Sequence, residues 1–356
     1  MIIRSISATP VHIPYAAPVG PYIGRGGSGG TLGATALVVR IETDNGLVGW
    51  GEGTGEFDTD VETLLKGRLA GDIEGICNAL EAAGVARGPL SGVEMALWDL
   101  IGKRAELPLC LVWGGRLRDE AEFTACMGLK EPAESASTAR QYRERWGFYS
   151  LKTKAGNDAA QDLAIAAAVQ REIGDEIAFR PDANSGYGSV EAEETMRRMK
   201  DLGVEHFEDP CSTEDLDTLY RIRTEIGIKV LVNMGVTVPD SVREVLVAEA
   251  ADFLMPDTPA AGSLARVRRV TAVAEGFGVP CLMHCSHDLG LKTAAITHLA
   301  ASMDNFSGPS DTCYHGLVDD VLSAKLSFAN GRIKVPEAPG LGVEVDEQKI
   351  ERYRIS

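Results

Sequence analysis

Short apolar runs recur along the middle of the chain, and a polar or charged residue stands at or near the end of each. The runs are FYSLKTK, IAFRPD, VEHFED, KVLVN, DFLMPD, CLMH and NFSGPSD. The polar residues follow one another at intervals of 28, 26, 25, 24, 27 and 27 positions, and they are Lys154, Asp182, Glu208, Asn233, Asp257, His284 and Asp311. A strand, a loop and a helix together need roughly 25 to 30 residues. The interval therefore predicts a repeated β-α unit whose parallel strands all end on one face.

Eight such units would close a barrel, which makes the expected fold class α/β with a (β/α)8 barrel over residues 119–318. The expected strands lie near 123–129, 148–154, 177–182, 204–208, 229–233, 252–257, 280–285 and 305–311. The alternative, an open doubly wound sheet, requires a nucleotide-binding fingerprint. Gly24, Gly26 and Gly29 spell GxGxxG, but the TALVVRIET that follows them is typical of a strand, so we interpret the match as a loop.

Residues 1–118 have a different pattern. MIIRSISATPVHI alternates between apolar and polar positions, and TALVVRIET and LVGWGEG flank Asp44-Asn45-Gly46, a strong hairpin signal. SGVEMALWDLIGKRAELP is a predicted helix that begins with Ser91 and Glu94 at capping-box spacing and ends before Pro108. We expect a separate α+β domain here, to which the tail, residues 319–356, returns.

Composition narrows the class of protein. A chain of 356 residues is long enough for a barrel and a smaller domain, and no apolar run approaches the roughly 18 to 20 residues of a membrane span. Seven scattered cysteines fit a reducing cytoplasm. The net charge of −17 argues against nucleic acid or an anionic membrane as partner. A small anionic substrate stays compatible with it, because a bound metal and local lysines reverse the field inside a pocket.

The acidic residues that close consecutive strands predict a metal site. The carboxylates of Asp182 and Glu208 should be neighbours, and two such anions repel each other unless a cation lies between them. Oxygen ligands of this kind suit Mg²⁺. Asn233 offers a neutral third oxygen, although it could instead bond to a loop backbone. Surface salt bridges are the alternative role of the two acids.

Lysine and histidine residues supply candidate acid–base groups. Lys152 and Lys154 are two positions apart, so their side chains share one face of a strand. A second ammonium and a divalent ion nearby lower the pKa of a lysine, which makes it a candidate base, although a solvated strand face is the alternative. Asp257 and His284 end consecutive strands, and such a carboxylate orients an imidazole for proton transfer. Candidates for further roles at the mouth are His287 as a rival of His284, His315, and Asp311 as either a protonated hydrogen-bond donor or a supporting carboxylate.

The ordered set LKTKAG, FRPDANSGY, HFEDP, VLVNM, FLMPD and LMHCSHD, together with SGVEMALWDLIGKRAELPLCLVWGG, resembles the enolase superfamily in its mandelate racemase/muconate lactonizing branch. The resemblance implies an α+β capping domain over a modified (β/α)8 barrel, a homo-oligomer, and Mg²⁺ that steadies an enolate formed by removing a proton α to a carboxylate. It implies that Lys154 is the second lysine of the KxK base motif and that Asp182 and Glu208 are the first two metal ligands. Asp257 and His284 match the Asp–His dyad of the mandelate racemase type, and Asp311 matches the acid of the eighth strand.

The chain departs from the family pattern at two positions. Asn233 stands where the third ligand is usually acidic, and Asp257 stands where the lactonizing type has lysine. The loop YAAPVGPYIGRGG resembles the family's substrate-covering loop. Candidate substrate contacts in and around it are Tyr15, Tyr22, Arg25, Asn184, His287 and His315.

We therefore expect a Mg²⁺-dependent enzyme acting on a small carboxylate, in which Lys152 helps to polarise the carboxylate and Lys154 takes the α-proton. His284 would act on the opposite face. Dehydration of a hydroxy or sugar acid is the main prediction; racemisation, epimerisation or cycloisomerisation by the same enolisation is the alternative. A non-catalytic binding protein, suggested by Asn233, and an aldolase or lyase that forms a Schiff base on Lys154 stay open.

Overall fold

The computed structural model describes residues 1–25 and 30–355. Its N-terminal part is a three-stranded antiparallel sheet in the order β1-β2-β3, formed by Ile3–Pro14, Gly33–Thr43 and Val48–Gly53. The β2–β3 turn falls on the predicted Asp44-Asn45-Gly46, where Gly46 has a φ of +82°. Of the glycines that match GxGxxG, Gly26 and Gly29 lie outside the described residues, and the segment from Gly33 is strand β2.

Four helices accompany this sheet: α1 (Val61–Leu65), α2 (Ile73–Ala82), α3 (Arg87–Ala105) and α4 (Leu109–Val112). The backbone of α3 packs directly on β3, because the strand reads VGWGEG and presents glycines to the helix. A Cβ at Gly51 would overlap the carbonyl oxygen of Gly92 in α3. The close approach of helix and strand therefore depends on glycine in β3.

The predicted capping box at Ser91 and Glu94 is wrong. The helix begins one turn earlier, at Arg87, and the Ser91 hydroxyl donates to the Gly88 carbonyl at 2.7 Å. The buried Glu94 carboxylate instead accepts the backbone N–H groups of Leu264 and Ala265, at 2.9 and 3.0 Å, in the first turn of a barrel helix. Glu94 of α3 thus caps the barrel helix that begins at Leu264, and this contact links the N-terminal part of the chain to the barrel.

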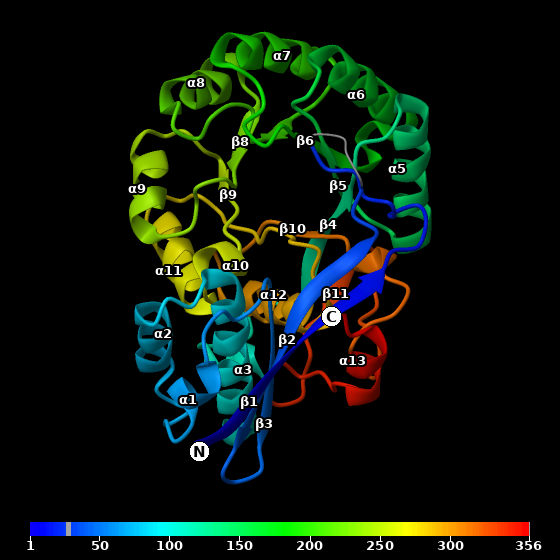
Figure 1. The fold of residues 1–356 in the computed structure, drawn as a ribbon. Coiled ribbons are helices and arrows are strands. Elements are labelled where there is room, and N and C mark those ends of the chain that lie inside the picture. The colour runs from blue at the N-terminus through cyan, green and yellow to red at the C-terminus, as the bar shows by residue number, and fades with distance from the viewer. Residues whose placement is uncertain (26–29, 356) are drawn as a thin grey trace.

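A curled parallel sheet forms the centre of the second part and confirms the predicted α/β barrel (Figure 1). Its strands follow the path β10-β4-β5-β6-β7-β8-β9, and β11 (Arg332–Lys334) pairs antiparallel with the start of β4. The parallel strands are β4 (Glu120–Met127), β5 (Ser150–Lys154), β6 (Ala178–Asp182), β7 (His206–Glu208), β8 (Lys229–Val232), β9 (Phe253–Leu254) and β10 (Ser310–Thr312).

The expected strand at 280–285 is a single bridge and not a regular strand. Cys281 bridges in parallel to Leu254, and the Leu282 N–H donates to the Leu254 carbonyl at 3.1 Å. On the other side, the Asp311 N–H donates to the Met283 carbonyl at 2.9 Å. The segment therefore fills the position between β9 and β10 and closes the ring.

Helices surround the ring on the outside (Figure 1). They are α5 (Pro132–Trp146), α6 (Ala159–Ile173), α7 (Ser189–Asp201), α8 (Leu216–Arg221), α9 (Pro239–Val247), α10 (Thr258–Ala261), α11 (Leu264–Glu275) and α12 (Gly290–Ser302), with short turns of other helix types at Gly174–Glu176, Ile222–Ile226 and Tyr314–Gly316. Within the described ranges, no helix combines the length and the apolar composition needed to cross a membrane.

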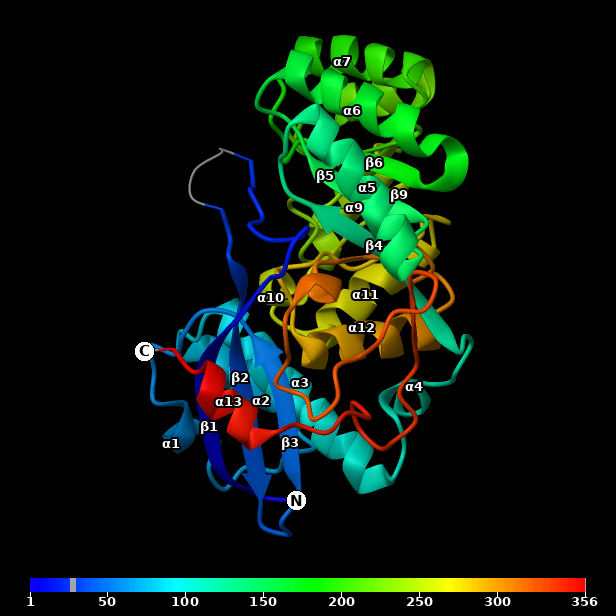
Figure 2. The ribbon, with the colours of Figure 1, turned by 90° about the vertical axis from the view of Figure 1, so that its right-hand side faces the viewer.

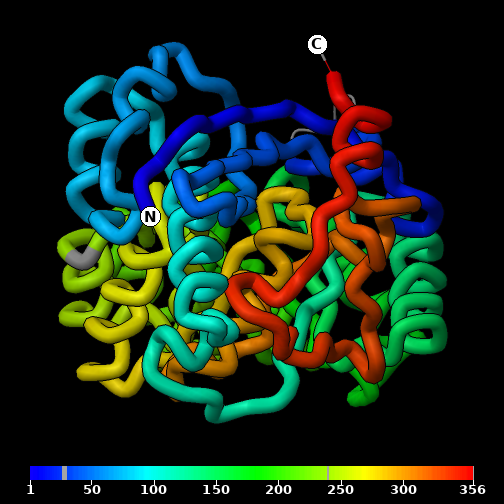
Figure 3. The backbone as a smooth tube through the Cα atoms, turned by 90° about the horizontal axis from the view of Figure 1, so that it is seen from below, coloured from blue at the N-terminus to red at the C-terminus, as the bar shows by residue number. Residues whose placement is uncertain are grey.

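The C-terminal segment passes back along the barrel to the N-terminal sheet. Helix α13 (Glu347–Tyr353) lies against β1 in two perpendicular views (Figures 2 and 3), and Arg354 bridges to Val11. The chain ends beside the sheet in which it begins. The exact domain limits at 118 and 318 stay predictions.

Candidate active site

The register of the parallel strands brings three of the predicted residues side by side. Lys154 at the end of β5 pairs with Asp182 at the end of β6, and Asp182 pairs with Glu208 at the end of β7. The Lys154 Nζ lies 2.6 Å from Asp182 Oδ2, and the Lys152 Nζ lies 3.1 Å from the same oxygen. Both lysine side chains thus point to the same carboxylate.

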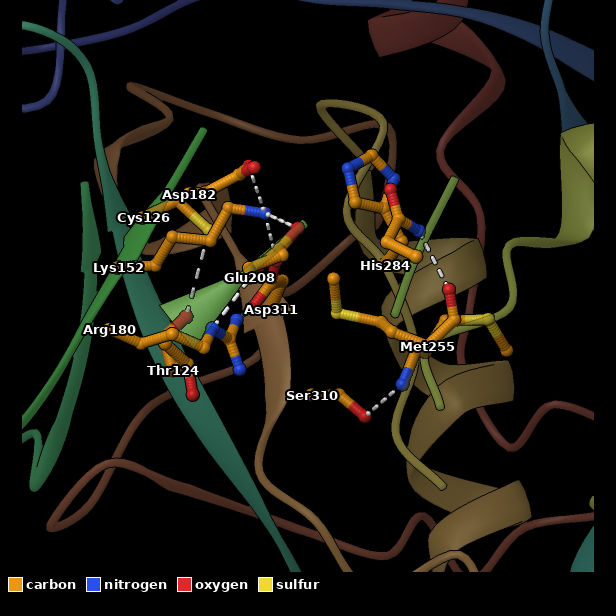
Figure 4. A network of polar contacts seen from close by, with 12 residues as sticks. Thr124, Cys126, Lys152, Arg180, Asp182, Glu208, Met255, His284, Ser310 and Asp311 are labelled. Carbon is orange, nitrogen blue, oxygen red and sulfur yellow. Dashed lines mark hydrogen bonds and ion pairs between the residues drawn. The ribbon is translucent and has the colours of Figure 1, made fainter. Parts of the chain in front are cut away.

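Lys152 is the centre of a buried ion cluster (Figure 4). Its Nζ also lies 2.8 Å from Glu208 Oε1 and 2.7 Å from Asp311 Oδ2. Burial favours the neutral amine, but Asp182, Asp311 and Glu208 together outweigh it and raise the pKa of Lys152 well above its usual value. Without a divalent ion, the three carboxylates therefore oppose the lowering expected from the lysine pair and hold the proton on Lys152.

Arg180 is a member of this cluster that the sequence argument overlooked. Its guanidinium bonds to Asp311, and its Nε lies 3.1 Å from Glu208 Oε2. Burial raises the pKa of Asp311, but Arg180 and Lys152 outweigh burial, and the net shift is downward. Asp311 therefore stays ionised, and a role as protonated donor does not fit. The position of Arg180, two residues before Asp182 on the same strand face, was a signal that could have identified it.

A second overlooked residue, Asp209, joins Asp182 and Glu208 in a buried acidic triad whose ligand oxygens all lie within 4.8 Å of one another. Asp209 has a φ of +40°, and its carboxylate accepts the backbone N–H groups of Asn233 and Met234, each at 3.0 Å. Burial and the neighbouring Asp182 raise the pKa of Glu208 to about 8 and that of Asp209 to about 7. In the absence of a cation, burial and mutual repulsion therefore disfavour ionisation of Glu208 and Asp209.

The donor set fits a hard divalent cation. Asp182, Glu208, Asp209 and Asp311 face three cationic side chains, Lys152, Lys154 and Arg180, which leaves one negative charge in excess when all are ionised. Glu208 Oε2 is buried and, despite its nearness to Arg180, has no well-aligned hydrogen bond to any described residue. Carboxylate oxygens in this arrangement match the preference of Mg²⁺. The family members typically bind Mg²⁺.

Asn233 lies next to this triad. Its Nδ2 donates to the Met255 carbonyl at 2.7 Å, which is the loop-backbone contact considered as the alternative to metal ligation. Its Oδ1 accepts no hydrogen bond from any described residue. The amide therefore keeps an oxygen that could serve as a ligand.

His284 lies on the other side of the site from Lys152 and Glu208 (Figure 4), and Asp257 contacts it. The backbone N–H of His284 donates to the Pro256 carbonyl at 3.0 Å. This contact holds the backbone of His284 beside that of Asp257, so that the two side chains can meet. His284 Nδ1 lies 3.1 Å from Asp257 Oδ2. The other nitrogen of the imidazole is left for a reacting group.

The N-terminal loop reaches the mouth of the barrel through its predicted residues. The Tyr15 hydroxyl lies 2.8 Å from His287 Nδ1, and the Tyr22 ring packs edge-on against the His287 ring. Arg25 donates to the Asn184 carbonyl at 2.9 Å, and Asn184 Oδ1 accepts from Lys154 at 3.0 Å. Burial and the nearby His284 lower the pKa of His287 to about 4, so its ring is neutral.

His315 does not reach the mouth, contrary to the expectation from sequence. Its ring packs edge-on against Tyr142, Trp146 and Phe148, and neither ring nitrogen has a hydrogen-bond partner within the described part of the chain. Burial lowers the pKa of His315 to about 3. The side chain points outward because the Tyr314–Gly316 turn directs it between the ring of strands and α5.

Comparison with known proteins agrees with this geometry. Family models described as "Enolase C-terminal domain-like" and "Mandelate racemase / muconate lactonizing enzyme, N-terminal domain" match residues 134–349 and 27–114. The chain is 30% identical to the L-Ala-D/L-Glu epimerase of Bacillus subtilis (strain 168), over 87% of this chain and 89% of the relative. It is 28% identical to a probable glucarate dehydratase of Streptomyces coelicolor, over 88% and 83%.

The fold is also similar to that of a solved structure, the N-succinyl Arg/Lys racemase of Bacillus cereus, with a TM-score of 0.91, 22% identity, and coverage of 100% of this chain and 99% of the other. The two domain models together span most of the sequence, and the relatives are enzymes. This chain therefore belongs to the enolase superfamily, as an enzyme of its mandelate racemase/muconate lactonizing branch.

Proposed function

We propose that this enzyme removes the proton α to the carboxylate of a hydroxy or sugar acid and expels the β-hydroxyl as water. The observation that carries the proposal is the placement of two proton-transfer groups, one within the ion cluster and one across the site from it. Lys154 approaches from β5, and His284, supported by Asp257, approaches from the segment that follows β9. A substrate held between them would meet a base on one face and an acid on the other.

The charges of the site support binding of a carboxylate. The excess negative charge of the cluster becomes a positive one when a divalent ion is added. Asp182 and Glu208 would hold Mg²⁺, with Asp209 or Asn233 as the nearby third oxygen, and the ion would supply charge that stabilises an enolate. Lys152 keeps its proton and would donate a hydrogen bond to the carboxylate of the substrate. Arg180 and Asp311 hold Lys152 in place.

Two residues of the chain would carry out the two proton transfers of the dehydration. Lys154 would take the α-proton, so that the C–H bonding pair enters the enolate. His284, as an imidazolium that carries a proton on Nε2 as well as on Nδ1, would then donate the Nε2 proton to the β-hydroxyl as its C–O bond breaks, and water leaves. The resulting enol becomes a 2-keto acid when the substrate carries an α-hydroxyl. Hydroxyl, amide and ring-nitrogen groups at the mouth, from Tyr15, Asn184 and His287, suit a polyhydroxylated acid.

Epimerisation is the second candidate, and the 30% identity to an epimerase favours it. In that reaction His284 would return a proton to the α-carbon from the opposite face. The similarity to a probable glucarate dehydratase and the polar mouth weigh toward dehydration. The two reactions share the first step and diverge at the atom that receives the second proton.

A screen in D₂O tests the proposal. The enzyme with Mg²⁺ is incubated with panels of sugar acids, hydroxy acids and dipeptides, and ¹H NMR follows the α-proton while semicarbazide detects keto acid. We expect loss of the α-proton together with keto acid for a sugar acid. Deuterium incorporation with inversion and no keto acid would establish epimerisation instead. Absence of exchange with every compound would favour a binding protein. Borohydride trapping of a Schiff base on Lys154 would support the aldolase or lyase alternative.

A further inference from the structure

A buried lysine on α12 contacts the dyad from behind. Lys292 is 2% exposed, and its Nζ lies 2.6 Å from Asp257 Oδ1 and 2.8 Å from Asp288 Oδ1. The same Nζ is 3.4 Å from the carbonyl oxygen of His284. One cation thus contacts the carboxylate that supports the histidine and the backbone of the histidine itself.

The position of Lys292 is set by residues far away in the chain. Glu52 of β3 accepts the backbone N–H groups of Leu289 and Lys292 at 2.7 and 2.8 Å, and Asp320 accepts that of Gly290 at 3.2 Å. The first turn of α12 is therefore anchored by the N-terminal sheet and by the C-terminal segment. A lysine whose backbone is anchored in this way and whose Nζ is paired with two carboxylates is suited to a positioning role.

The two oxygens of Asp257 have separate partners. Oδ1 takes Lys292, whereas Oδ2 takes His284 Nδ1 and the Ser286 hydroxyl. Burial alone would raise the pKa of Asp257, but Lys292 and His284 outweigh burial and the net shift is downward. An ionised carboxylate can only accept hydrogen bonds, so His284 must carry its proton on Nδ1.

We propose that Lys292 is a positioning residue that keeps Asp257 ionised and thereby selects the tautomer of His284 with hydrogen on Nδ1. The Nε2 atom is then free to take up a proton, which forms an imidazolium paired with Asp257, and to deliver that proton to substrate. The catalytic consequence rests on the proposed function, whereas the tautomer itself does not.

Removal of the cation should reverse the arrangement. Without Lys292, Asp257 stays buried with no cationic partner apart from a protonated imidazole, so near neutral pH it takes up a proton. A protonated Asp257 donates to His284 Nδ1, and the imidazole hydrogen moves to Nε2. The other titratable or charged groups that face this cluster are Asp288 and His287 from its own loop, Glu52 from β3, Asp320 from the C-terminal segment, and Tyr15 and Asp311 from the loop and strand opposite.

The matched control is Lys103 in α3. Its Nζ lies 2.6 Å from the buried Asp99, the same distance as in the Lys292–Asp257 pair, but the pair belongs to the N-terminal part. Lys103→Met therefore removes a lysine–aspartate contact of equal length without touching the dyad. Lys292→Arg keeps the charge and should restore the wild-type behaviour in part.

The experiment reads the tautomer directly, in the full chain without substrate. Long-range ¹H–¹⁵N NMR of protein labelled at its six histidines, with His284 assigned from His284→Asn, distinguishes protonated Nδ1 from protonated Nε2. We expect Nδ1–H in wild type, K103M and K292R, and Nε2–H in K292M. K292Q replaces K292M if the latter does not fold, and Asp257→Asn, whose amide donates to Nδ1, should also give Nε2–H.

Persistence of Nδ1–H in K292M or K292Q, or Nε2–H already in wild type, would overturn the proposal whether or not any substrate is known. Once a substrate is found, kcat of K292M at pH 7 should fall by about 100-fold with little change in KM. The acidic limb of its pH–rate profile should move upward, because activity returns as Asp257 loses its proton. An unchanged profile beside a switched tautomer would reject the proposed role of His284 and leave the positioning role intact.

Discussion

Arg180 gives the sharpest test of the charge balance in the ion cluster. The side chain is 6% exposed and is the partner of both Asp311 and Glu208. Arg180→Met fills similar space but removes one of the three cations. With all four acids ionised, the excess negative charge of this buried cluster rises from one to two.

Loss of one partner from a buried ion pair costs about 3 to 5 kcal/mol. We expect a decrease of this size in the free energy of unfolding of R180M, measured by urea denaturation with circular dichroism in metal-free buffer. The partly exposed pair of Arg223 and Asp252, 2.8 Å apart, supplies the control, and Arg223→Met should cost less than Arg180→Met because solvent screens the remaining charge better.

Divalent cation should restore part of the loss, because ligand that binds the folded state stabilises it by mass action. R180M should therefore gain more stability than wild type when Mg²⁺ is added to saturation, provided that the triad is the metal site. Equal losses for R180M and R223M in metal-free buffer would refute the buried-charge reasoning. A gain from Mg²⁺ that is the same in R180M and wild type would refute the link between the cluster and the metal.

Three further predictions concern single residues. Lys154→Ala and His284→Asn should each abolish turnover with an unchanged circular dichroism spectrum; normal turnover of the histidine variant would direct attention to His287. Asn233→Asp should tighten Mg²⁺ binding in calorimetric titration if the amide oxygen is a ligand, and an unchanged affinity would exclude it. Burial and the neighbouring Asp288 raise the pKa of Glu52 to about 8, so protonated Glu52 stabilises the fold at low pH and this contribution is lost as pH rises from about 4.5 to 8. Glu52→Gln should flatten that decline in urea midpoints, and a decline as steep as in wild type would count against it.

Some of the overlooked residues were accessible to sequence reasoning. Arg180 shares a strand face with Asp182, and the rule that placed Lys152 beside Lys154 applies to it equally. Asp209 follows Glu208 directly, but alternation along a strand assigns it to the opposite face. Its φ of +40° breaks that alternation and returns the carboxylate toward the triad.

The prediction of a capping box was wrong because Glu94 accepts hydrogen bonds from backbone N–H groups far away in the sequence and does not cap its own helix. Glu94 stands three residues after Ser91, yet its carboxylate bonds to Leu264 and Ala265, 170 and 171 positions away. Lys292 escaped notice for the same reason. Its partners Asp257 and Glu52 meet it only after three separate parts of the chain have packed together.

The sequence by itself determined the barrel and the residues that end its strands, because a β-α unit has a nearly constant length and parallel strands end on one face. It also determined the hairpin at Asp44–Gly46, since turn chemistry is local. Only the tertiary structure decided which charges neutralise one another, which carboxylates stay uncompensated, and which lysine stands behind the Asp257–His284 pair. Those properties depend on burial and on distances of a few ångströms between elements whose separation in sequence carries no such information.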